Sequence, residues 1–424
     1  MKLKRYKGEI IFLVLITFFS FWLRFDGLSF PNQIVSDENY FVNFGRSYVA
    51  GQFYHDVHPP FGKFFIALGI KIFGDQPFGW RFFPCFFGAL LVPLGYLLTR
   101  AIFEKKFIAA FFSFFILFDG MFFVQSRMAR LDTAYLFFIF LAYLFFFWGL
   151  KKKEGKKAFP LLLAGIFFGL SFSVKWVALA AGVPIFLIWL FQTAWFRKFK
   201  FSRFFKLPPE RVNHVSWEKM FLFFVLIPLA LYLLVWQIHY GLVKTEPITF
   251  YENYKIFTYH QGIEEIHSLG SPFWSWPLLI QPFTYFFEKT ATGIRYIADL
   301  GNPLIWWPAL ISLFYFLWKK RLKNQEINLI LILFMAHFLP FMLIKRSLFL
   351  YHFLAAAPFL WLFLAYGLNQ LWEKNKKSRI LVVGYLFLIF CAFIFFCPVL
   401  TGQEISFSAL KLRWWLISWF PLAL

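Results

Sequence analysis

Residues 9–25, EIIFLVLITFFSFWLRF, form an apolar segment of membrane-spanning length, and residues 36–63, SDENYFVNFGRSYVAGQFYHDVHPPFGK, follow shortly after it. The second stretch contains ionisable side chains at seven positions: Asp37, Glu38, Arg46, His55, Asp56, His58 and Lys63. Ionisable groups next to a bilayer are energetically costly, so function is the first explanation for keeping them there. We therefore expect the chemistry of this protein in the loop that follows the first apolar segment.

The composition extends this interpretation to the whole chain. The 424 residues are 60% hydrophobic and only 15% charged, whereas soluble domains are about 25% charged. Apolar stretches of about 20 residues, each long enough to cross the hydrocarbon core of a bilayer, recur along the sequence. The predicted fold class is therefore an all-α polytopic membrane protein, and the lipid bilayer is its first partner.

Basic residues set the predicted topology. The formal net charge of +22 is a feature of many nucleic-acid-binding proteins, but here Lys and Arg gather in short segments between apolar runs, so no nucleic-acid partner is expected. Two membrane crossings fit between each consecutive pair of these segments, which places all of them on one side, the cytoplasm. The basic segments are residues 2–7, 100–106, 151–157, 197–211, 319–323 and 374–379.

The resulting model has about eleven transmembrane helices, with the N-terminus inside, the C-terminus outside and a single membrane domain over residues 1–424 without a separate soluble domain. Two large loops, residues 26–80 and 238–302, lie outside. Residues 64–73 in the first loop are too short to cross the membrane and predict a juxtamembrane helix lying along its surface. The predicted spans are residues 9–25, 81–99, 103–119, 133–150, 158–173, 176–192, 218–237, 303–318, 327–344, 353–372 and 380–398.

Asp37 and Glu38 are the first candidates for catalysis. Two adjacent carboxylates can supply a general base and a second, supporting acidic group. Neighbouring side chains on a helix point about 100° apart, so only one of the two can face a reacting centre. The alternative is a helix N-cap formed by Ser36 or Asp37, and both roles can coexist.

The segment HDVHPPFGK, residues 55–63, holds a second set of polar groups. His55 and His58, with Asp56 between them, could ligate a metal ion. No third ligand stands at a suitable spacing, so a divalent metal is not favoured and a helix start rich in hydrogen-bonding groups is preferred. We expect His55, Asp56 and His58 to support the site.

Several cations fall at the predicted outer ends of helices. Isolated cations there usually anchor a helix at the interface. A group of them outside, against the positive-inside trend, suits an anionic substrate such as a lipid phosphate, which Arg binds with two parallel hydrogen bonds. Asp132 is expected to orient one of them. The outer cations are Arg81, Arg127, Arg130, Lys175, Lys345 and Arg346.

Eight motifs occur in an order that resembles one family, the protein O-mannosyltransferases. They are DENYF (37–41), FYHDVHPPFGK (53–63), WRFFP (80–84), FDGMFFVQSRMARLD (118–132), SVKW (173–176), SPFWSWPLL (271–279), LGNPLIWW (300–307) and RSLFLYHFLAAAPF (346–359). Members of this family are polytopic GT-C glycosyltransferases that use polyprenyl- or dolichyl-phosphate-mannose. The resemblance covers residues 26 to about 372.

The resemblance implies roles for several residues. It implies that Asp37 deprotonates a Ser or Thr hydroxyl of an acceptor protein, with Glu38 as its partner, in an inverting transfer of mannose. Arg81, Arg346 and His352 are implied to contact the donor phosphate or sugar. Arg127 and Lys345 are grouped with them as donor-binding candidates, and Asp132 and Lys175 as supporting residues.

Departures from the family pattern refine the expectation. Tyr40 stands where a His is usual, Ala178 replaces a Gly, and the loop after the seventh predicted helix has no room for the β-trefoil domain of eukaryotic members. These features favour a bacterial enzyme in the cytoplasmic membrane, with its site on the periplasmic face, exported proteins as acceptors and the export machinery as a further partner. Two alternatives stay open: a GT-C transferase that moves another sugar to lipid A or a glycan, and a lipid or solute transporter.

Overall fold

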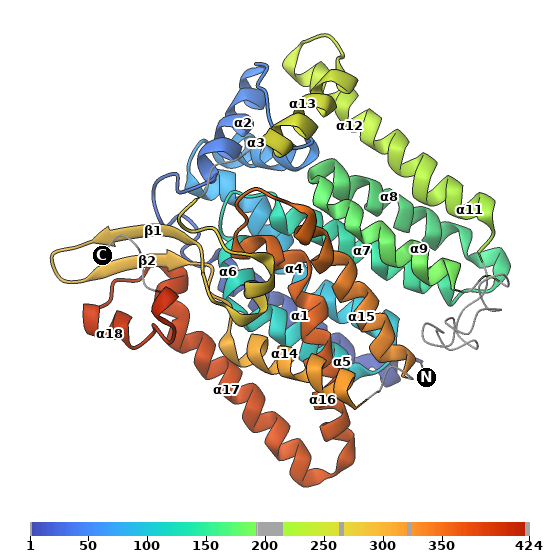
Figure 1. Cartoon of the computed structure of the whole chain (residues 1–424), viewed down its shortest axis with the longest axis vertical. Helices are drawn as coiled ribbons and strands as arrows, with labels where there is room; N and C mark the ends of the chain where they lie inside the picture. Colours follow the sequence, from blue (N-terminus) through green and yellow to red (C-terminus); the bar gives the residue numbers. More distant parts are fainter. Residues whose placement is uncertain (1, 192, 194–214, 263–266, 320–323, 420–424) are drawn as a thin grey trace.

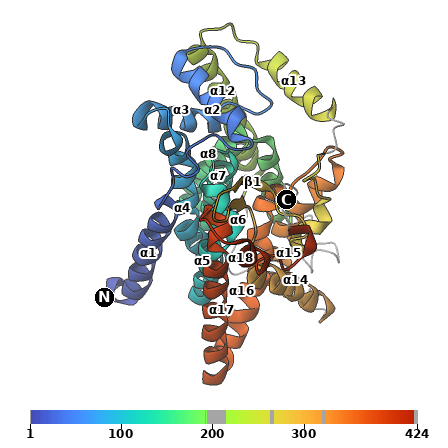
Figure 2. The ribbon, with the colours of Figure 1, turned by 90° about the vertical axis from the view of Figure 1, so that its left-hand side faces the viewer.

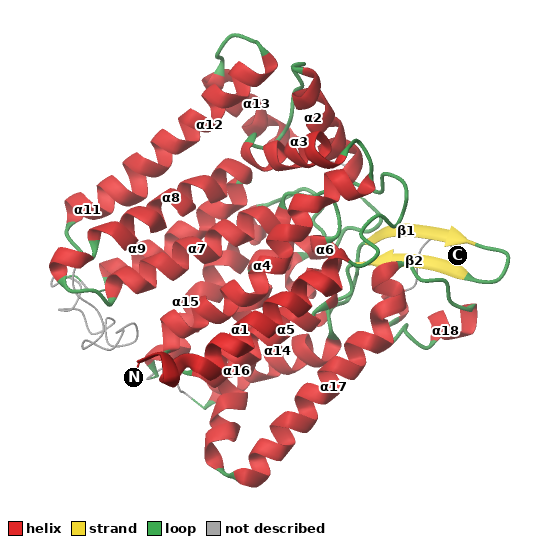
Figure 3. Ribbon diagram, turned by 180° about the vertical axis from the view of Figure 1, so that it is seen from behind, coloured by secondary structure: helices red, strands yellow, loops and turns green. Residues whose placement is uncertain are grey.

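The computed structural model describes residues 2–191, 193, 215–262, 267–319 and 324–419, and helices dominate it (Figure 1, Figure 3). The basic segment 197–211 and residues 320–323 lie outside the described residues. The helices of the first half are α1 (Lys2–Phe25), α2 (Glu38–Ala50), α3 (Phe61–Phe73), α4 (Pro77–Phe103), α5 (Lys106–Phe118), α6 (Gly120–Ser126), α7 (Asp132–Leu150), α8 (Ala158–Val174) and α9 (Gly182–Leu190). Those of the second half are α11 (Trp217–Phe221), α12 (Ile227–Val243), α13 (Thr249–Gly262), α14 (Pro303–Trp318), α15 (Gln325–Phe338), α16 (Ala357–Lys374), α17 (Lys376–Thr401) and α18 (Phe407–Lys411).

The predicted class, a polytopic helical membrane protein, is confirmed. In the described part of the chain, six helical segments are long and apolar enough to cross a membrane, and the bent pair α5 and α6, at 61°, makes a seventh. Three shorter apolar helices, Ala158–Val174, Trp176–Leu190 and Pro303–Trp318, accompany them. Each predicted span falls on a helix or helix pair, but the count of about eleven crossings is not confirmed by helix length and composition.

Contacts between helix ends agree with the predicted topology. Arg100, at the end of α4, pairs with Glu9 near the start of α1 at 2.8 Å. Lys151, after α7, pairs with Glu104 in the α4–α5 link at 2.7 Å. The rings of Phe107 in α5 and Trp372 in α16 lie 4.7 Å apart. The N-terminus and three of the basic links therefore share one end of the bundle.

The opposite end carries α2, α3 and α13, which all lie in the upper part of both views (Figure 1, Figure 2). Helix α3 begins directly after Pro59 and Pro60, so the predicted juxtamembrane helix is present and somewhat longer than expected. The loop between α2 and α3 is attached to α13 by two contacts. His55 pairs with Glu252 at 2.7 Å, and a ring nitrogen of His260 lies 2.9 Å from the carbonyl oxygen of Val57.

A two-stranded antiparallel hairpin, β1 (Thr284–Lys289) and β2 (Ile294–Ala298), lies in the second outer loop and was not predicted. Glu288 faces Arg295 across the pair, and Ile294 forms a further bridge to Ile405 beyond α17. Five- or six-residue strands give little signal in a chain this rich in apolar and aromatic residues, because short apolar runs fit helix and strand alike.

The break between α5 and α6 is stabilised by one buried carboxylate. Asp119 accepts hydrogen bonds from the backbone N–H groups of Phe122 (3.0 Å) and Asn302 (2.9 Å) and from Nε1 of Trp306 (2.6 Å). A Cβ atom at Gly120 would come within 2.1 Å of the carbonyl oxygen of Leu300. Asp119 therefore caps the start of α6 and joins it to α14, which directs the following loop towards the outer end.

Replacing Asp119 by Ala is expected to destabilise the protein by about 3 kcal/mol, because three buried donors lose their acceptor. The measurement is thermal unfolding in detergent. Asp75→Ala is the control, since Asp75 forms an exposed pair with Arg46, and such pairs contribute about 0–1 kcal/mol. Equal unfolding temperatures for the two variants would show that the Asp119 cluster does not stabilise the fold.

Candidate active site

Asp37 lies at the N-terminal edge of α2, after Ser36, whose φ angle is +48°. It occupies the N-cap position, but its side chain makes no capping hydrogen bond. Its Oδ2 instead accepts hydrogen bonds from Nη1 of Arg130 at 2.5 Å and from the hydroxyl of Tyr351 at 3.3 Å. The side chain is 32% exposed. Asp37 is therefore an accessible carboxylate held in place by groups from two distant segments.

Glu38 has a different environment from its neighbour. Its side chain is 1% exposed, and it accepts hydrogen bonds from the backbone N–H groups of Val35 (3.1 Å) and Ala129 (2.8 Å). Nε and Nη2 of Arg81 donate to the same carboxylate at 2.7 and 2.8 Å. Adjacent carboxylates thus point in different directions, as helix geometry requires, and only Asp37 is open to a reactant.

Arg81 and Arg127, both predicted to contact the donor, are committed to the protein scaffold. Besides Glu38, the Arg81 guanidinium donates to the carbonyl oxygens of residues in the first outer loop: Leu28, Pro31 and Gln33. Arg127 donates to the carbonyl oxygens that end α1: Arg24, Asp26 and Gly27. Neither residue is part of the lining of the cavity described below. Their protein acceptors use N–H donors that a phosphate would need, and a contact of either arginine with the donor stays a prediction.

A row of alternating charges leads away from Asp37. Nε of Arg130 lies 3.2 Å from Oδ2 of Asp132, and Nζ of Lys175 lies 2.9 Å from Oδ1 of the same carboxylate. All three side chains are buried. Asp132 therefore pairs with two of the outer cations, Arg130 and Lys175. A buried charge that loses its partner is strongly destabilising. The three side chains are therefore held in contact with one another.

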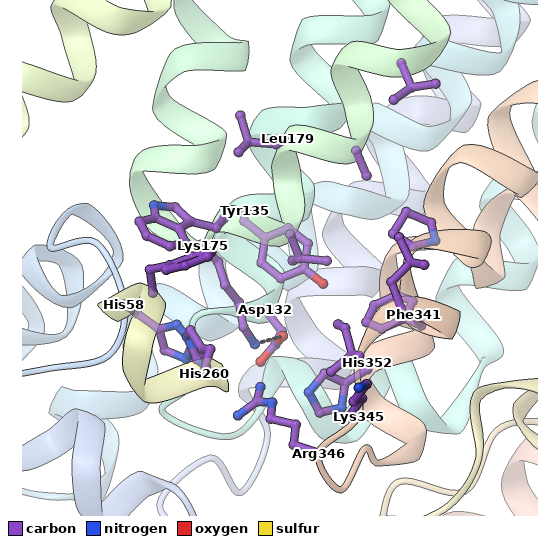
Figure 4. A pocket seen from close by; sticks show the side chains of 18 residues that line it. His58, Asp132, Tyr135, Lys175, Leu179, His260, Phe341, Lys345, Arg346 and His352 are labelled. Carbon is purple, nitrogen blue, oxygen red and sulfur yellow. Dashed lines mark hydrogen bonds and ion pairs between the residues drawn. The ribbon is translucent and has the colours of Figure 1, made fainter. Parts of the chain in front are cut away.

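Lys175 opens onto a cavity of about 850 Å³ (Figure 4). The cavity lies between the segment after α8, the start of α7, α13 and the segment between α15 and α16. Polar side chains gather at one end of it, and apolar ones form the remaining wall. The polar lining comprises His58, Asp132, Tyr135, Lys175, His260, Lys345, Arg346 and His352.

The charges of this cavity favour an anion. Lys175, Lys345 and Arg346 contribute three positive charges against the one carboxylate of Asp132, which leaves an excess of two. Lys175 is paired, whereas Lys345 and Arg346 form no ion pair or hydrogen bond with any residue in the described ranges. Two uncompensated cations in the lining of one cavity are suited to binding a phosphate group.

Three histidines of the cavity carry little charge at neutral pH. Burial, with the nearby cations Lys175 and Arg346, lowers the pKa of His58 and of His352 well below the usual 6.5, and the pKa of His260 is lowered for the same reasons. The rings of His58 and His260 lie 5.5 Å apart. His260 was not singled out from the sequence, and only its place in the second outer loop pointed to it.

His55 and Asp56 hold the loop and do not face the cavity. His55 pairs with Glu252 of α13, and Asp56 pairs with the buried Lys63 of α3, which also donates to the carbonyl oxygen of His58 at 2.7 Å. The two predicted histidines thus point to different partners. Within the residues that the structure describes, no group of three His, Cys, Asp or Glu side chains is placed to hold a metal ion.

The apolar wall of the cavity continues to the surface of the bundle. Leu179, Val183 and Leu343 line it and are 49%, 45% and 79% exposed. Exposed apolar side chains on a polytopic helical protein suit contact with lipid. The cavity therefore joins a cationic end to an exposed apolar wall.

This fold is the GT-C fold of polytopic membrane proteins. The structure superposes on the Saccharomyces cerevisiae protein O-mannosyltransferase Pmt1–Pmt2 complex bound to the sugar donor with a TM-score of 0.83 and 16% identity, covering 98% of this chain and 93% of that one. It superposes on ArnT from Cupriavidus metallidurans bound to undecaprenyl phosphate with a TM-score of 0.60 and 16% identity, covering 92% and 64%.

The chain belongs to the dolichyl-phosphate-mannose-protein mannosyltransferase family, which it matches over residues 14–80 and 73–243. Residues 248–419 match the C-terminal four-transmembrane region of protein-O-mannosyltransferase. Mannosyltransferase 6 of Saccharomyces cerevisiae is 29% identical over 256 residues, 55% of this chain, and the chain spans about a third (33%) of that relative's length. The polyprenol-phosphate-mannose–protein mannosyltransferase of Mycolicibacterium smegmatis is 26% identical, covering 86% of this chain and 82% of the relative.

The lowered pKa of His58 predicts a pH-dependent stability. The unfolded state takes up a proton near pH 6.5 while the folded state does not, so the contribution of His58 is fully present above pH 6.5 and is lost as the pH falls. Lys63, Lys175, His260 and Arg346 are the charged and titratable groups that act on it. Between pH 7 and 5, wild type should lose more stability than His58→Gln, by up to about 1.4 kcal/mol per pH unit. Parallel unfolding-temperature curves for the two proteins would contradict this.

Proposed function

We propose that this protein transfers mannose from polyprenyl-phosphate-mannose to Ser or Thr hydroxyls of exported proteins, with inversion at the sugar. The observation that carries the proposal is the accessible carboxylate of Asp37, connected through Arg130 and Asp132 to a cationic cavity with a lipid-facing wall. Membership of the mannosyltransferase family and the name of the mycobacterial relative support the same reaction.

The cavity suits the donor in both of its chemical parts. Lys175, Lys345 and Arg346 would bind the phosphate, with His352 beside it. The polyprenyl chain would follow the apolar wall into the bilayer, where burying each CH₂ group contributes about 0.8 kcal/mol. A donor that never leaves the membrane explains why the transferase is a membrane protein.

The transfer is a single displacement. The acceptor oxygen attacks C1 of mannose while the bond from C1 to the phosphate oxygen breaks, and the electron pair of that bond passes to the phosphate. Asp37 takes the hydroxyl proton, and Oδ1 is the atom for this task, because Oδ2 already accepts two hydrogen bonds. The cavity cations stabilise the charge that develops on the phosphate. Attack from the face opposite the leaving group inverts the anomeric centre.

Glu38, Arg81 and Arg127 have supporting roles in this proposal. Glu38 and Arg81 attach the loop before α2 to α4, and Arg127 holds the turn after α1. They keep Asp37 next to Arg130, at the end of the charge row that leads to the cavity, without contacting the donor. The basic links at the opposite end of the bundle support a location of this site on the outer face of a bacterial cytoplasmic membrane. Proteins emerging from the export machinery would be within reach of the site there.

Asp37→Asn is expected to lower mannose transfer by about 10²-fold or more, since a positioned general base contributes about 10²–10⁴-fold. The assay incubates membranes with radiolabelled polyprenyl-phosphate-mannose and a Ser/Thr peptide. Asp75→Asn, which changes an exposed carboxylate, is the control and should be unaffected. Undiminished transfer by Asp37→Asn would remove the base assignment. Wild-type transfer only to a lipid or glycan acceptor would replace the protein acceptor in this proposal.

Arg346→Met is expected to raise the KM for the donor by about 10- to 100-fold, because a hydrogen bond to a charged group contributes about 1.5–3 kcal/mol. The KM for the peptide should change little. The matched control is Arg379→Met, which removes an arginine that contacts Trp372 at the basic end of the bundle. An unchanged donor KM would exclude Arg346 from phosphate binding.

A further inference from the structure

Arg130 has an environment unlike that of the other outer arginines. Its side chain is 2% exposed, and its guanidinium bonds Asp37 through Nη1 and Asp132 through Nε. The guanidinium also lies 3.9 Å above the ring of Tyr351. Of the cations in the described part of the chain, Arg130 is the one that pairs with Asp37. It comes from the short loop between α6 and α7, whose direction the Asp119 break determines.

The contacts of Arg130 limit the freedom of the Asp37 carboxylate. A carboxylate that is a third exposed can rotate, and a base in the wrong orientation does not meet the acceptor hydroxyl. Arg130 and the Tyr351 hydroxyl both bind Oδ2. Oδ1 accepts no hydrogen bond from the residues that the structure describes, so it is left for the acceptor. Stacking on Tyr351 restricts the orientation of the guanidinium, and the hydrogen bond to Oδ2 in turn restricts the carboxylate.

Arg130 also connects the two halves of the site. Asp132 accepts from Arg130 with Oδ2 and from Lys175 with Oδ1. The row Asp37, Arg130, Asp132 and Lys175 therefore has alternating charges from the acceptor side to the donor side. During transfer Asp37 becomes neutral and the phosphate gains negative charge. Once Asp37 is protonated, it no longer compensates the positive charge of Arg130. The row then carries one more net positive charge, which stabilises the negative charge on the phosphate at its other end.

We propose that Arg130 is a positioning residue of the transfer reaction, which orients Asp37 for the acceptor and links it through Asp132 and Lys175 to the donor phosphate. This inference rests on the proposed function. It assigns Arg130 no contact with the substrate. Neither Arg81 nor Arg127 can take this role, because their donors are bonded to Glu38 and to backbone carbonyl oxygens.

The test compares Arg130→Met and Arg130→Lys with wild type in the peptide assay, with kcat, both KM values and the pH profile as readouts. In Arg130→Met, kcat should fall by about 10²-fold, since misplacing a reacting group by about 1 Å can lower the rate by that factor. The KM for the donor should stay within about threefold of the wild-type value. The acid limb of kcat/KM should move to higher pH, because removing a neighbouring cation makes a carboxylate easier to protonate. Arg130→Lys keeps the charge, so kcat should be reduced without that shift.

Arg100→Met is the matched control, because Arg100 also binds a carboxylate, Glu9, through two nitrogens but at the opposite end of the bundle. Its kinetic constants should equal those of wild type. If Arg130→Met does not fold, as judged by thermal unfolding in detergent, Arg130→Lys decides by its kcat, which should be at least tenfold below wild type.

A folded Arg130→Met with wild-type kcat would overturn the inference and leave the proposed function intact. The inference would also be overturned if Arg130→Met lowered both kcat and the affinity for the donor without shifting the pH profile. That result is expected of an arginine that only stabilises the fold. No transfer by wild type to any hydroxyl peptide would overturn the proposed function, and the inference with it.

Discussion

The buried pair of Glu38 and Arg81 is the interaction on which the outer end of this protein depends. Two charges are removed from solvent, and loss of either partner would leave the other buried and unpaired, at a cost of about 3–5 kcal/mol. Backbone N–H and carbonyl groups around the pair satisfy their remaining hydrogen-bonding capacity. The loop before α2 is thereby attached to α4, and the adjacent residue, Asp37, is held next to Arg130.

The requirement that a buried charge has a partner separates the cations of the outer end into two groups. Arg81 and Arg127 donate several hydrogen bonds each to protein acceptors and attach loops of this end to one another. Those without such partners in the described residues, Lys345 and Arg346, are available to an anionic ligand. Arg130 and Lys175 lie between these groups, because each is paired with a carboxylate of the charge row. An ionisable group near a bilayer is stable only when paired or hydrated, so its partners indicate its role.

Much of this arrangement could be predicted from the sequence. The helices, the shared end of the basic links and the charged loop containing Asp37 follow from hydropathy and charge order. The segment with Arg346 and His352 was recognised from a resemblance in its motif. The roles of Arg81 and Arg127 could not be predicted, because nothing local distinguishes an arginine that binds carbonyl oxygens from one that binds a ligand. The hairpin β1–β2 and the capping role of Asp119 were missed because short strands and helix breaks give weak signals in an apolar chain.

The sequence by itself determined that this is a polytopic helical membrane protein of the mannosyltransferase family with a charged outer loop. Hydropathy and charge order depend only on residues that are close in sequence, so both follow from the chain without its fold. Only the tertiary structure decided which charges meet. Asp37 contacts Arg130, 93 positions away, and Tyr351, 314 positions away. Hydrogen bonds depend on distances of about 3 Å and on side-chain direction, and packing of the helices sets both.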